Sequence, residues 1–374
     1  MNLQLENLEK TYLSSMFVIS HSSQTLRSYK TAINRLKKFL KEKYQIDELD
    51  LHLHVKNKEI DICNIFKEFV VYLDQTGLSP RTIKLSITVV KGYLRHIGIK
   101  IDSDDLKQLV KVPKIYKTRE IPLDKGIILR LLRNAKPKLQ LTILIAASTG
   151  MRIGEIASIR ISDIDFSCNP VKVNIRAEVT KTRQARETFL TTESANALKD
   201  YLKRYHNWSD DCKDQQILQT CIFGPIFRQR GNFSRESAVQ MLQVDLKDLV
   251  RSIPDLNVKN ENGRASIHFH AFRKFFRTTV GNAVGRDFAE ALMGHGFYMD
   301  TYYQLPEEKK REMFLEAEPY LTISDFKTIE TNLRNLSSTH SALENKVNGL
   351  IKYLINQSVH IPDNLLKNEN LSTF

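Results

Sequence analysis

The stretch AASTGMRIGEIASIRISDIDF, residues 146–166, carries the clearest sign of chemistry in the sequence. Gly150 and Gly154 flank Arg152, and an apolar helical pattern resumes further on, at Ile156 and Ile159. An arginine this close to a helix start could reach across a cleft instead of into solvent. Taken alone, such a residue is more often a surface or salt-bridged side chain, so the stretch needs support from elsewhere in the chain.

A second motif, HFHAFRKFFRTTV at residues 268–280, places His270 three residues before Arg273. On a helix the two side chains share a face and can converge on one small anion. The phenylalanines on the other faces would anchor that helix in a core. A partly buried histidine paired with a carboxylate is the commoner arrangement, so this motif alone is also ambiguous.

A third motif, ALMGHGFYMDTYYQ at residues 291–304, has a glycine-flanked histidine, His295, seven and eight residues ahead of Tyr302 and Tyr303. A glycine here could simply end a helix, and the aromatic residues could fill a core. The chemical interpretation is that a tyrosine hydroxyl near a phosphate-binding histidine attacks the backbone of a nucleic acid.

The composition of the 374-residue chain is that of a folded protein with a polyanionic partner. Apolar residues make up 41% and charged residues 26%, a balance typical of globular proteins. The 56 Lys and Arg against 43 Asp and Glu give a net charge of +13, which favours nucleic acid as the partner. The four cysteines have neither metal-ligand nor disulfide-framework spacing, and no segment is apolar enough for a signal peptide or a membrane span. We therefore expect a cytoplasmic, nucleoid-associated protein with no membrane partner, built as two domains and a tail.

Residues 1–112 are predicted to form a small, all-helical domain with basic outer faces. Ser79 has the position of an N-cap and Pro80 that of the first residue of a helix. The basic residues lie off the apolar stripes; each one alone is best explained as solvated, but as a set they could line phosphates. The apolar stripes are Leu26, Tyr29, Ile33, Leu36 and Leu40; Ile62, Ile65, Phe66, Phe69 and Leu73; and Ile83, Ile87, Val90 and Leu94.

The remaining chain divides into a linker, a mixed domain and a tail. Residues 113–122 hold two prolines, several charges and no periodicity, which indicates a linker. Residues 123–322 mix helical patterns with two alternating stretches on either side of KTRQAR, which predict a strand, a polar turn and a second strand. In residues 323–374 a heptad pattern predicts a coiled-coil seam; the alternative is an amphipathic helix packed on its own domain. The seam consists of Ile329, Leu333, Leu336, His340, Leu343, Val347, Leu350 and Leu354.

The three motifs gain force in combination, because cleavage of a phosphodiester without a metal needs the groups that they hold. The reaction requires a nucleophile, cationic donors that neutralise the pentavalent phosphorane, and a proton donor for the departing oxygen. Arg152 and Arg273 suit the second task, since guanidinium groups match phosphate oxygens bidentately and keep their charge. A tyrosine with a free pKa of about 10 needs this electropositive neighbourhood to act as the nucleophile. Lys181, in the polar turn, could reach a 5′ oxygen. Acidic clusters of the kind that bind metal in nucleases are not evident, so we expect no metal and no cofactor.

The motifs TGMRIGEIASIRISDID, EVTKTRQARETFL, HAFRKFF, LMGHG and TYYQ, in this order and at these intervals, resemble the tyrosine recombinase (phage integrase) family. The resemblance covers residues 122–320, and the N-terminal helices look like the core-binding domain of the family. It implies an α-helical N-terminal DNA-binding domain and a mixed α+β catalytic domain, which close around a duplex as a C-shaped clamp, with a helical or coiled-coil tail added here. Glu155 matches a supporting acidic position whose task is structural, while His268 lies outside the motif and is interpreted as incidental.

The resemblance also implies a role for each candidate catalytic residue. Arg152 and Arg273 would clamp the scissile phosphate, and His295 would donate a hydrogen bond to it. Lys181 would be the general acid for the 5′-hydroxyl leaving group. His270 would act as an acid, as a base or as a group that orients the phosphate.

The position of the nucleophile departs from the family pattern. The family usually places it nine residues after the histidine, where this chain has Gln304. Tyr303 requires a deletion of one residue in the intervening loop and Tyr302 a deletion of two. We favour Tyr303, because the preceding position is commonly hydrophobic or aromatic in the family, and Tyr302 would fill it. Both assignments stay open, and Tyr298 is a weaker third candidate.

By resemblance, four protomers on two double-stranded DNA sites would exchange strands through a Holliday junction and a covalent 3′-phosphotyrosine intermediate, with neither divalent metal nor nucleotide. The extra C-terminal tail favours a mobile-element integrase over a resolvase of chromosome dimers. We expect a protein that is mostly monomeric when free and tetrameric on DNA. The alternatives are a type IB topoisomerase-like enzyme and a non-catalytic DNA-binding accessory protein of the same fold.

Overall fold

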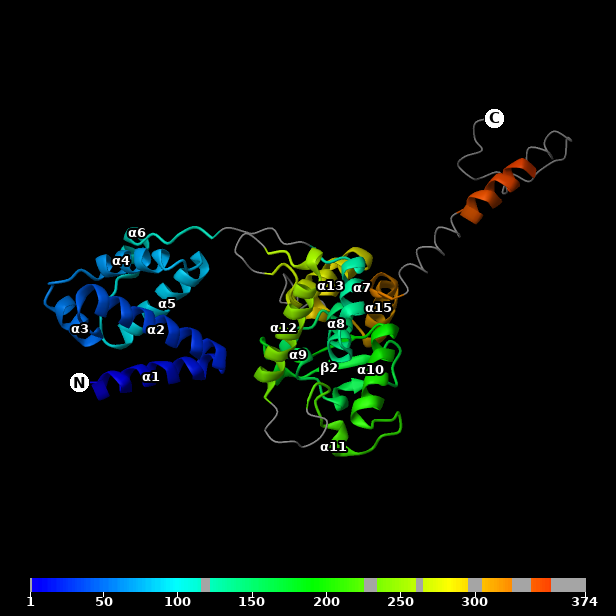
Figure 1. The fold of residues 1–374 in the computed structure, drawn as a ribbon, viewed down its shortest axis with the longest axis horizontal. Helices are drawn as coiled ribbons and strands as arrows, with labels where there is room; N and C mark the ends of the chain where they lie inside the picture. The colour runs from blue at the N-terminus through cyan, green and yellow to red at the C-terminus, as the bar shows by residue number, and fades with distance from the viewer. Residues whose placement is uncertain are drawn as a thin grey trace. The chain divides into compact units, whose positions relative to one another are not determined.

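The computed structural model describes residues 2–115, 122–224, 234–259, 265–294, 305–324 and 338–350. The chain divides into two compact units, Met1–Lys117 and Thr118–Phe374. Figure 1 shows the first unit in blue and cyan, and the helices and strands of the second from green to orange. Of the helices in the described ranges, none combines the length and the apolar character needed to cross a lipid bilayer.

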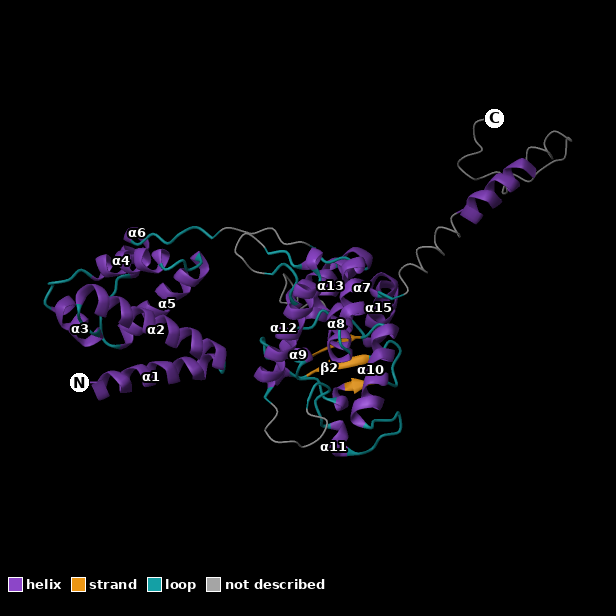
Figure 2. Ribbon diagram, viewed as in Figure 1, coloured by secondary structure: helices purple, strands orange, loops and turns teal. Residues whose placement is uncertain are grey.

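The first unit is helical throughout its described residues, with loops between the helices (Figure 2). The helix starts are set by capping side chains. Ser79 Oγ accepts the Thr82 backbone N–H at 3.3 Å, with Pro80 in the first helical position, so the predicted helix start is confirmed. The helices are α1 (Asn2–Ser20), α2 (Ser23–Tyr44), α3 (Glu48–Lys56), α4 (Ile62–Gln75), α5 (Pro80–His96) and α6 (Ser103–Leu109).

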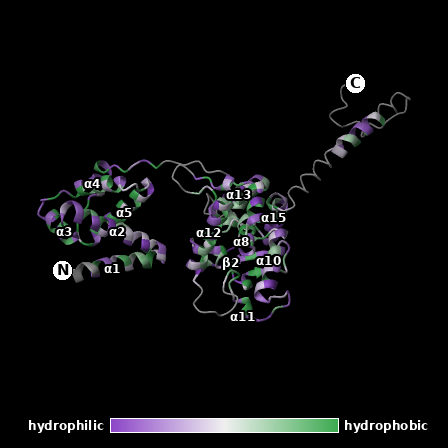
Figure 3. Ribbon diagram, in the orientation of Figure 1, coloured by the Kyte–Doolittle hydropathy of each residue, from purple (hydrophilic) through white to green (hydrophobic). Residues whose placement is uncertain are grey.

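The core of the first unit lies among α2, α4 and α5, where the apolar stripes read from the sequence are all buried or half-buried. The polar and apolar sides of these helices are visible in Figure 3 as purple and green. Two basic residues depart from the expected outer faces: Lys37 is bound to Glu9 at 2.7 Å and Lys91 to Ser103 at 2.8 Å, both half-buried. The basic residues that remain exposed include Arg27, Lys30, Lys38, Arg81, Lys84 and Arg95.

The second unit packs helices around a small antiparallel sheet of order β1-β2-β3. In the register, Val173 of β2 lies opposite Ile164 of β1 and Thr188 of β3. The predicted strands on either side of the KTRQAR turn are confirmed as β2 and β3. The elements are α7 (Lys125–Asn134), α8 (Pro137–Thr149), α9 (Ile153–Ile156), η1 (Ile161–Asp163), β1 (Ile164–Asp165), β2 (Lys172–Ile175), η2 (Ala177–Val179), β3 (Arg186–Phe189), α10 (Thr192–His206), α11 (Gln215–Leu218), α12 (Arg235–Ser252), η3 (Pro254–Leu256), α13 (Phe269–Ala283), α14 (Arg286–Met293) and α15 (Glu307–Leu321).

Helix α8 is the central element of this unit, because it is apolar on every side and every residue from Leu141 to Thr149 is buried. It contacts α10 and α13. The helix ends at Gly150, whose φ of +61° is the left-handed conformation that favours glycine. A side chain at this position would also collide with the ring of Phe276 on α13, so the end of α8 sits directly against α13.

Two predictions need comment. The helix after Arg152 is shorter than the sequence pattern indicated: α9 ends at Ile156, and Ile159 is buried outside it. The carbonyl of Ile159 instead accepts the backbone N–H of Ile222 at 3.0 Å, in a short antiparallel pairing of the two segments. In the tail, residues 338–350 are helical, and Leu343 and Leu350 are 63% and 62% exposed. The other members of the proposed seam, apart from His340 and Val347, lie outside the described residues.

Candidate active site

Arg152 is the residue that precedes α9, in the break between Gly150 and the new helix. Its backbone is extended, with φ −72° and ψ 145°, and its N–H donates to Glu155 Oε2 at 2.9 Å. Its guanidinium Nη1 donates to Glu155 Oε1 at 3.0 Å, and the side chain is 29% exposed. Arg152 is therefore salt-bridged, as the simplest interpretation of the sequence held, and it also reaches the surface, as a phosphate ligand must.

Arg273 lies in the second turn of α13 and is 2% exposed. Its Nη1 donates to the carbonyl of Gly150, at the end of α8, and its Nη2 donates to the carbonyl of Met293, at the end of α14, at 2.7 Å. Its Nε has no hydrogen-bond partner among the described residues. Burial, with the neighbouring charge of Arg152, lowers the pKa of Arg273 to about 10, so the side chain stays a cation at neutral pH.

Glu155 joins two arginines. The carboxylate is 1% exposed and accepts hydrogen bonds from Arg152 and from Arg186. Burial acts to raise the pKa of Glu155, but the hydrogen bonds and charges of Arg186 and Arg152 prevail and hold it below its ordinary value. The expected structural task of Glu155 thus has a concrete form: an ionised carboxylate that holds two guanidinium groups.

Arg186 was missed in the sequence, although it ends the KTRQAR turn. It begins β3 and donates from Nη2 to Glu155 Oε2 at 2.7 Å and from Nη1 to Oε1 at 3.3 Å. Its Nε donates to the carbonyl of Leu292, in the last turn of α14, at 3.0 Å. The one available signal was indirect: a buried glutamate needs a cationic partner. The sequence does not say which of its many arginines fills that role.

Lys181 lies in the turn between η2 and β3, and its side chain is exposed. The turn is tied together by Thr180 Oγ1, which bonds to the carbonyls of Ala177 and Gln184 at 3.0 and 3.1 Å. Arg235, at the start of α12, also holds this segment by donating a hydrogen bond to the carbonyl of Val179, the last residue of η2, at 2.9 Å. An exposed amine on a tethered turn has room to reach a bound strand.

His270 is exposed on the first turn of α13. It is three residues from Arg273, as the sequence indicated, but the two differ in surroundings, since Arg273 is buried. His268 is less incidental than expected, because its ring lies 6.3 Å from the ring of His270 with planes 19° apart. His268 Nδ1 also lies 3.2 Å from the carbonyl of Ser266.

His295 and Tyr303 lie outside the described residues, as do the alternatives Tyr302 and Tyr298. What the structure describes is where that segment begins: α14 ends at Gly294, whose φ is +65°. The last-turn carbonyls of α14 are the ones that Arg186 and Arg273 bind. Of the described candidates, Arg273 therefore binds the end of α14 directly, and Arg152 is linked to it through Glu155 and Arg186.

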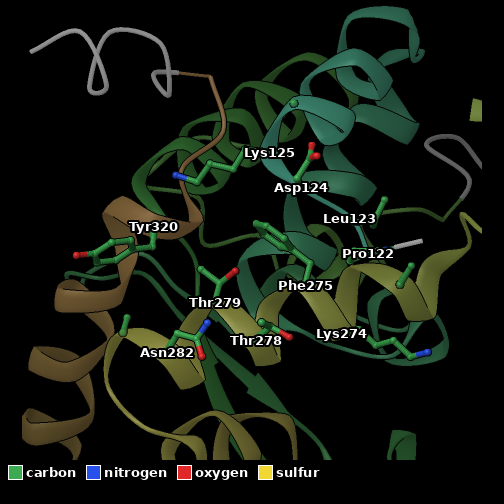
Figure 4. A pocket seen from close by; sticks show the side chains of 13 residues that line it. Pro122, Leu123, Asp124, Lys125, Lys274, Phe275, Thr278, Thr279, Asn282 and Tyr320 are labelled. Atoms are coloured by element: carbon green, nitrogen blue, oxygen red, sulfur yellow. The ribbon is translucent and has the colours of Figure 1, made fainter. Parts of the chain in front are cut away.

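A separate hollow of about 1070 Å³ lies on another part of the second unit, between the start of α7, α13 and the end of α15 (Figure 4). Asp124, Lys274, Thr279 and Tyr320 are among the side chains that line it. None of the candidate residues lines this hollow. Across the described residues, no three side chains of His, Cys, Asp or Glu are grouped so that they could hold a metal ion.

Comparison with known proteins identifies the fold and the family. Residues 100–301 match the model of the family described as "Phage integrase family". The chain belongs to this family. It is a tyrosine-type site-specific recombinase, and its reaction is DNA recombination. The family match spans Arg152, Lys181, His270, Arg273 and His295, and ends two residues before Tyr303.

Among its relatives, the recombinase is 22% identical over 331 residues to tyrosine recombinase XerC of Staphylococcus aureus strain JH9, covering 84% of this chain and 97% of the relative. Two solved structures share its fold. One is a lambda integrase (75-356) dimer bound to a COC′ core site, with TM-score 0.54, 16% identity, and coverage of 81% of this chain and 99% of the other. The other is a lambda integrase tetramer bound to a Holliday junction, with TM-score 0.52, 18% identity, and coverage of 81% and 80%. The predicted fold, a helical N-terminal region and a catalytic domain with a small sheet, is confirmed.

Proposed function

We propose that this recombinase cuts DNA by attack of Tyr303 on a phosphodiester, leaving a 3′-phosphotyrosine and a free 5′-hydroxyl. The new bond joins the tyrosine oxygen to phosphorus, and the bond to the 5′ oxygen breaks. Rejoining reverses these steps with the 5′-hydroxyl of another strand. The observation that carries the proposal is that Arg152, at the start of α9, and Arg273, bound to the ends of α8 and α14, are two cations linked through Glu155 and Arg186.

The charges of the site suit this chemistry. Arg273 is a buried cation whose pKa of about 10 leaves it charged, and Arg152 combines a salt bridge with partial exposure. A phosphorane carries two negative charges, and its attraction to Arg273 would offset part of the free energy that the burial of this cation costs. Lys181, exposed on its turn, would supply the proton to the 5′ oxygen. His270, acting as a base, would take the proton that the tyrosine hydroxyl loses, and His295 would donate a hydrogen bond to the phosphate.

The assembly and the biological reaction form the second part of the proposal. Four protomers would act on two double-stranded sites, with the 1–112 domain and the 123–322 domain of each protomer both contacting DNA and residues 113–122 as the linker. A lambda integrase of this fold is seen as a tetramer on a Holliday junction, which supports the stoichiometry. The added tail, residues 323–374, favours integration and excision of a mobile element.

The experiment uses a suicide duplex, nicked so that the cleaved end diffuses away and the covalent complex accumulates. The sequence of the site comes from duplexes that the wild-type protein selects out of a library with a randomised centre. We expect Tyr303→Phe to bind this DNA normally and to form no covalent adduct, since only the attacking oxygen is lost. The matched control is Tyr302→Phe, which should retain the adduct. The reverse result would assign the nucleophile to Tyr302, and an adduct in both variants would refute both assignments.

A further inference from the structure

We propose that Arg186 is a positioning residue of the recombination reaction, one that holds the phosphate-binding Arg152 and the end of α14 in a fixed relation to each other. The proposal rests on the proposed function for the role of Arg152 alone. It concerns a residue that touches no reacting atom. Arg186 acts through two neighbours, Glu155 on one side and the carbonyl of Leu292 on the other.

The first link is the forked contact with Glu155. Arg186 reaches both carboxylate oxygens, at 2.7 and 3.3 Å, and the same two oxygens accept the backbone N–H and the Nη1 of Arg152. The plane of the carboxylate therefore determines where the Arg152 guanidinium points. Because Glu155 is 1% exposed, water does not replace a lost partner, and Arg186 becomes the group that fixes this plane.

The second link is the contact with α14. A helix leaves its last carbonyls without partners inside the helix. Here Arg186 binds the carbonyl of Leu292 and Arg273 binds that of Met293, so two guanidinium groups from different elements hold one helix end. Arg186 thus couples the end of α14 to the same carboxylate that orients Arg152.

Gly294 gives independent support for this arrangement. A Cβ at Gly294 would lie 2.7 Å from Cδ, 3.0 Å from Nε and 3.2 Å from Cζ of Arg186. The guanidinium end of Arg186 therefore passes directly beneath the glycine, and the first glycine of the LMGHG motif makes room for it as well as adopting a positive φ. The close approach shows that the position of Arg186 is built into the site.

Arginine is the side chain that can make these contacts together. It presents donors on three nitrogens in one plane, and Arg186 uses all three, two on Glu155 and one on Leu292. A lysine ammonium at this place is a single point and cannot span both partners. The Arg186 side chain is 9% exposed, so its charge is largely removed from water and depends on Glu155.

The test compares Arg186→Met and Arg186→Lys with the wild-type protein. On the selected suicide duplex, we expect nearly unchanged DNA affinity and a single-turnover rate of adduct formation lower by about 10²-fold in Arg186→Met, the scale for misplacing a catalytic group by about 1 Å. Arg186→Lys, which keeps the charge, should recover little of this rate. An Arg186→Met variant that cleaves within about twofold of wild type would overturn the proposal.

The pH dependence of the cleavage rate distinguishes a positioning role of Arg186 from a contribution to the stability of the fold alone. Glu155 is faced by Arg152 beside α9, Arg186 on β3 and Arg273 on α13. Without Arg186, burial should raise the pKa of Glu155 above its ordinary value. Cleavage by Arg186→Met should then fall as the pH falls from neutral, because the protonated carboxyl no longer orients Arg152. The wild-type protein should lack this added loss, since its Glu155 stays ionised, so the ratio of the Arg186→Met rate to the wild-type rate should fall as the pH falls. Parallel profiles would count against the proposal.

The matched control is Arg176→Met. Arg176 is also a half-buried arginine in an ion pair, with Asp163 at 3.1 Å, and it binds the carbonyl of Ser158 at 2.8 Å, but it does not touch Glu155. We expect it to lose stability without the pH-dependent loss of cleavage. Hydrogen exchange in the free proteins adds a readout without chemistry: the amides at the end of α14 should exchange faster in Arg186→Met than in Arg176→Met. Equal exchange rates in the two variants would refute the link to α14, and this readout does not depend on cleavage. A wild-type protein that forms no adduct would instead refute the proposed function.

Discussion

Replacement of Arg273 by methionine should separate catalysis from stability. The change removes two hydrogen bonds from a charged donor to the carbonyls of Gly150 and Met293, together worth about 3–6 kcal/mol at about 1.5–3 kcal/mol each. It also removes a buried cation. Burial lowers the pKa of Arg273 from its ordinary value to about 10, which corresponds to about 3 kcal/mol of destabilisation of the charged form. The free energy of unfolding should therefore drop by only about 0–3 kcal/mol.

The effect of Arg273→Met on cleavage should be much larger. Loss of one preorganised donor to the transition state lowers the rate by about 10²–10³-fold, or about 2.7–4 kcal/mol. Arg273→Lys should restore little, because an ammonium cannot bridge both carbonyls and bind phosphate in the same fork. Arg152→Ala should cost at least about 10²-fold for the same reason.

The assays are urea unfolding at neutral pH for stability and single-turnover adduct formation on the selected suicide duplex for chemistry. Arg277→Met is the matched control, since Arg277 lies one turn further along α13, is 47% exposed and pairs with Glu290, a largely buried carboxylate of α14. We expect it to cleave normally. Cleavage by Arg273→Met within about threefold of wild type would refute the phosphate-clamp assignment. A loss of stability far above the stated range would show that Arg273 is mainly a structural cation.

Two further predictions concern the assembly and the metal. Truncation after Ser324 should leave single-site DNA binding intact and impair synapsis or recombination, because the exposed Leu343 and Leu350 of the tail are available for a partner. Light scattering and a synapsis gel on the full-length and truncated proteins test this, and equal assembly by both would refute it. EDTA should leave adduct formation unchanged, since the arginines supply the positive charge at the phosphate, and a rate that falls with EDTA and returns with Mg²⁺ would contradict this.

Local features of the fold could be read from the sequence because their causes are local. The Ser79 N-cap, the three apolar stripes of the first unit and the strands beside KTRQAR depend on residues a few positions apart. The pattern after Arg152 was less informative. Ile156 and Ile159 have helical spacing, yet the helix ends at Ile156, because a backbone pairing with Ile222, more than sixty residues away, takes over.

For the candidate site, the sequence pointed to individual residues but not to the contacts among them. Arg152 and Arg273 stood out because two glycines and a nearby histidine marked them. The sequence could not show that Arg273 would be buried with its donors on two carbonyls, since both acceptors are backbone atoms on other elements. Arg186 was overlooked for the same reason: its partners, Glu155 and Leu292, come from distant parts of the chain.

The helix ends around the arginines explain how the site can hold so much positive charge. Among the described residues, Glu155 is the one carboxylate in contact with the guanidiniums of Arg152 and Arg186, and the hydrogen bonds of Arg273 go to backbone carbonyls. The remaining acceptors are carbonyls at the carboxyl ends of α8 and α14, where the macrodipole of a helix amounts to about half a negative charge. Such partial charges stabilise a guanidinium group without neutralising its positive charge. Full carboxylates in their place would repel the phosphate of the proposed reaction, so the two helix ends act as weak counter-ions that leave the arginines with a net positive field.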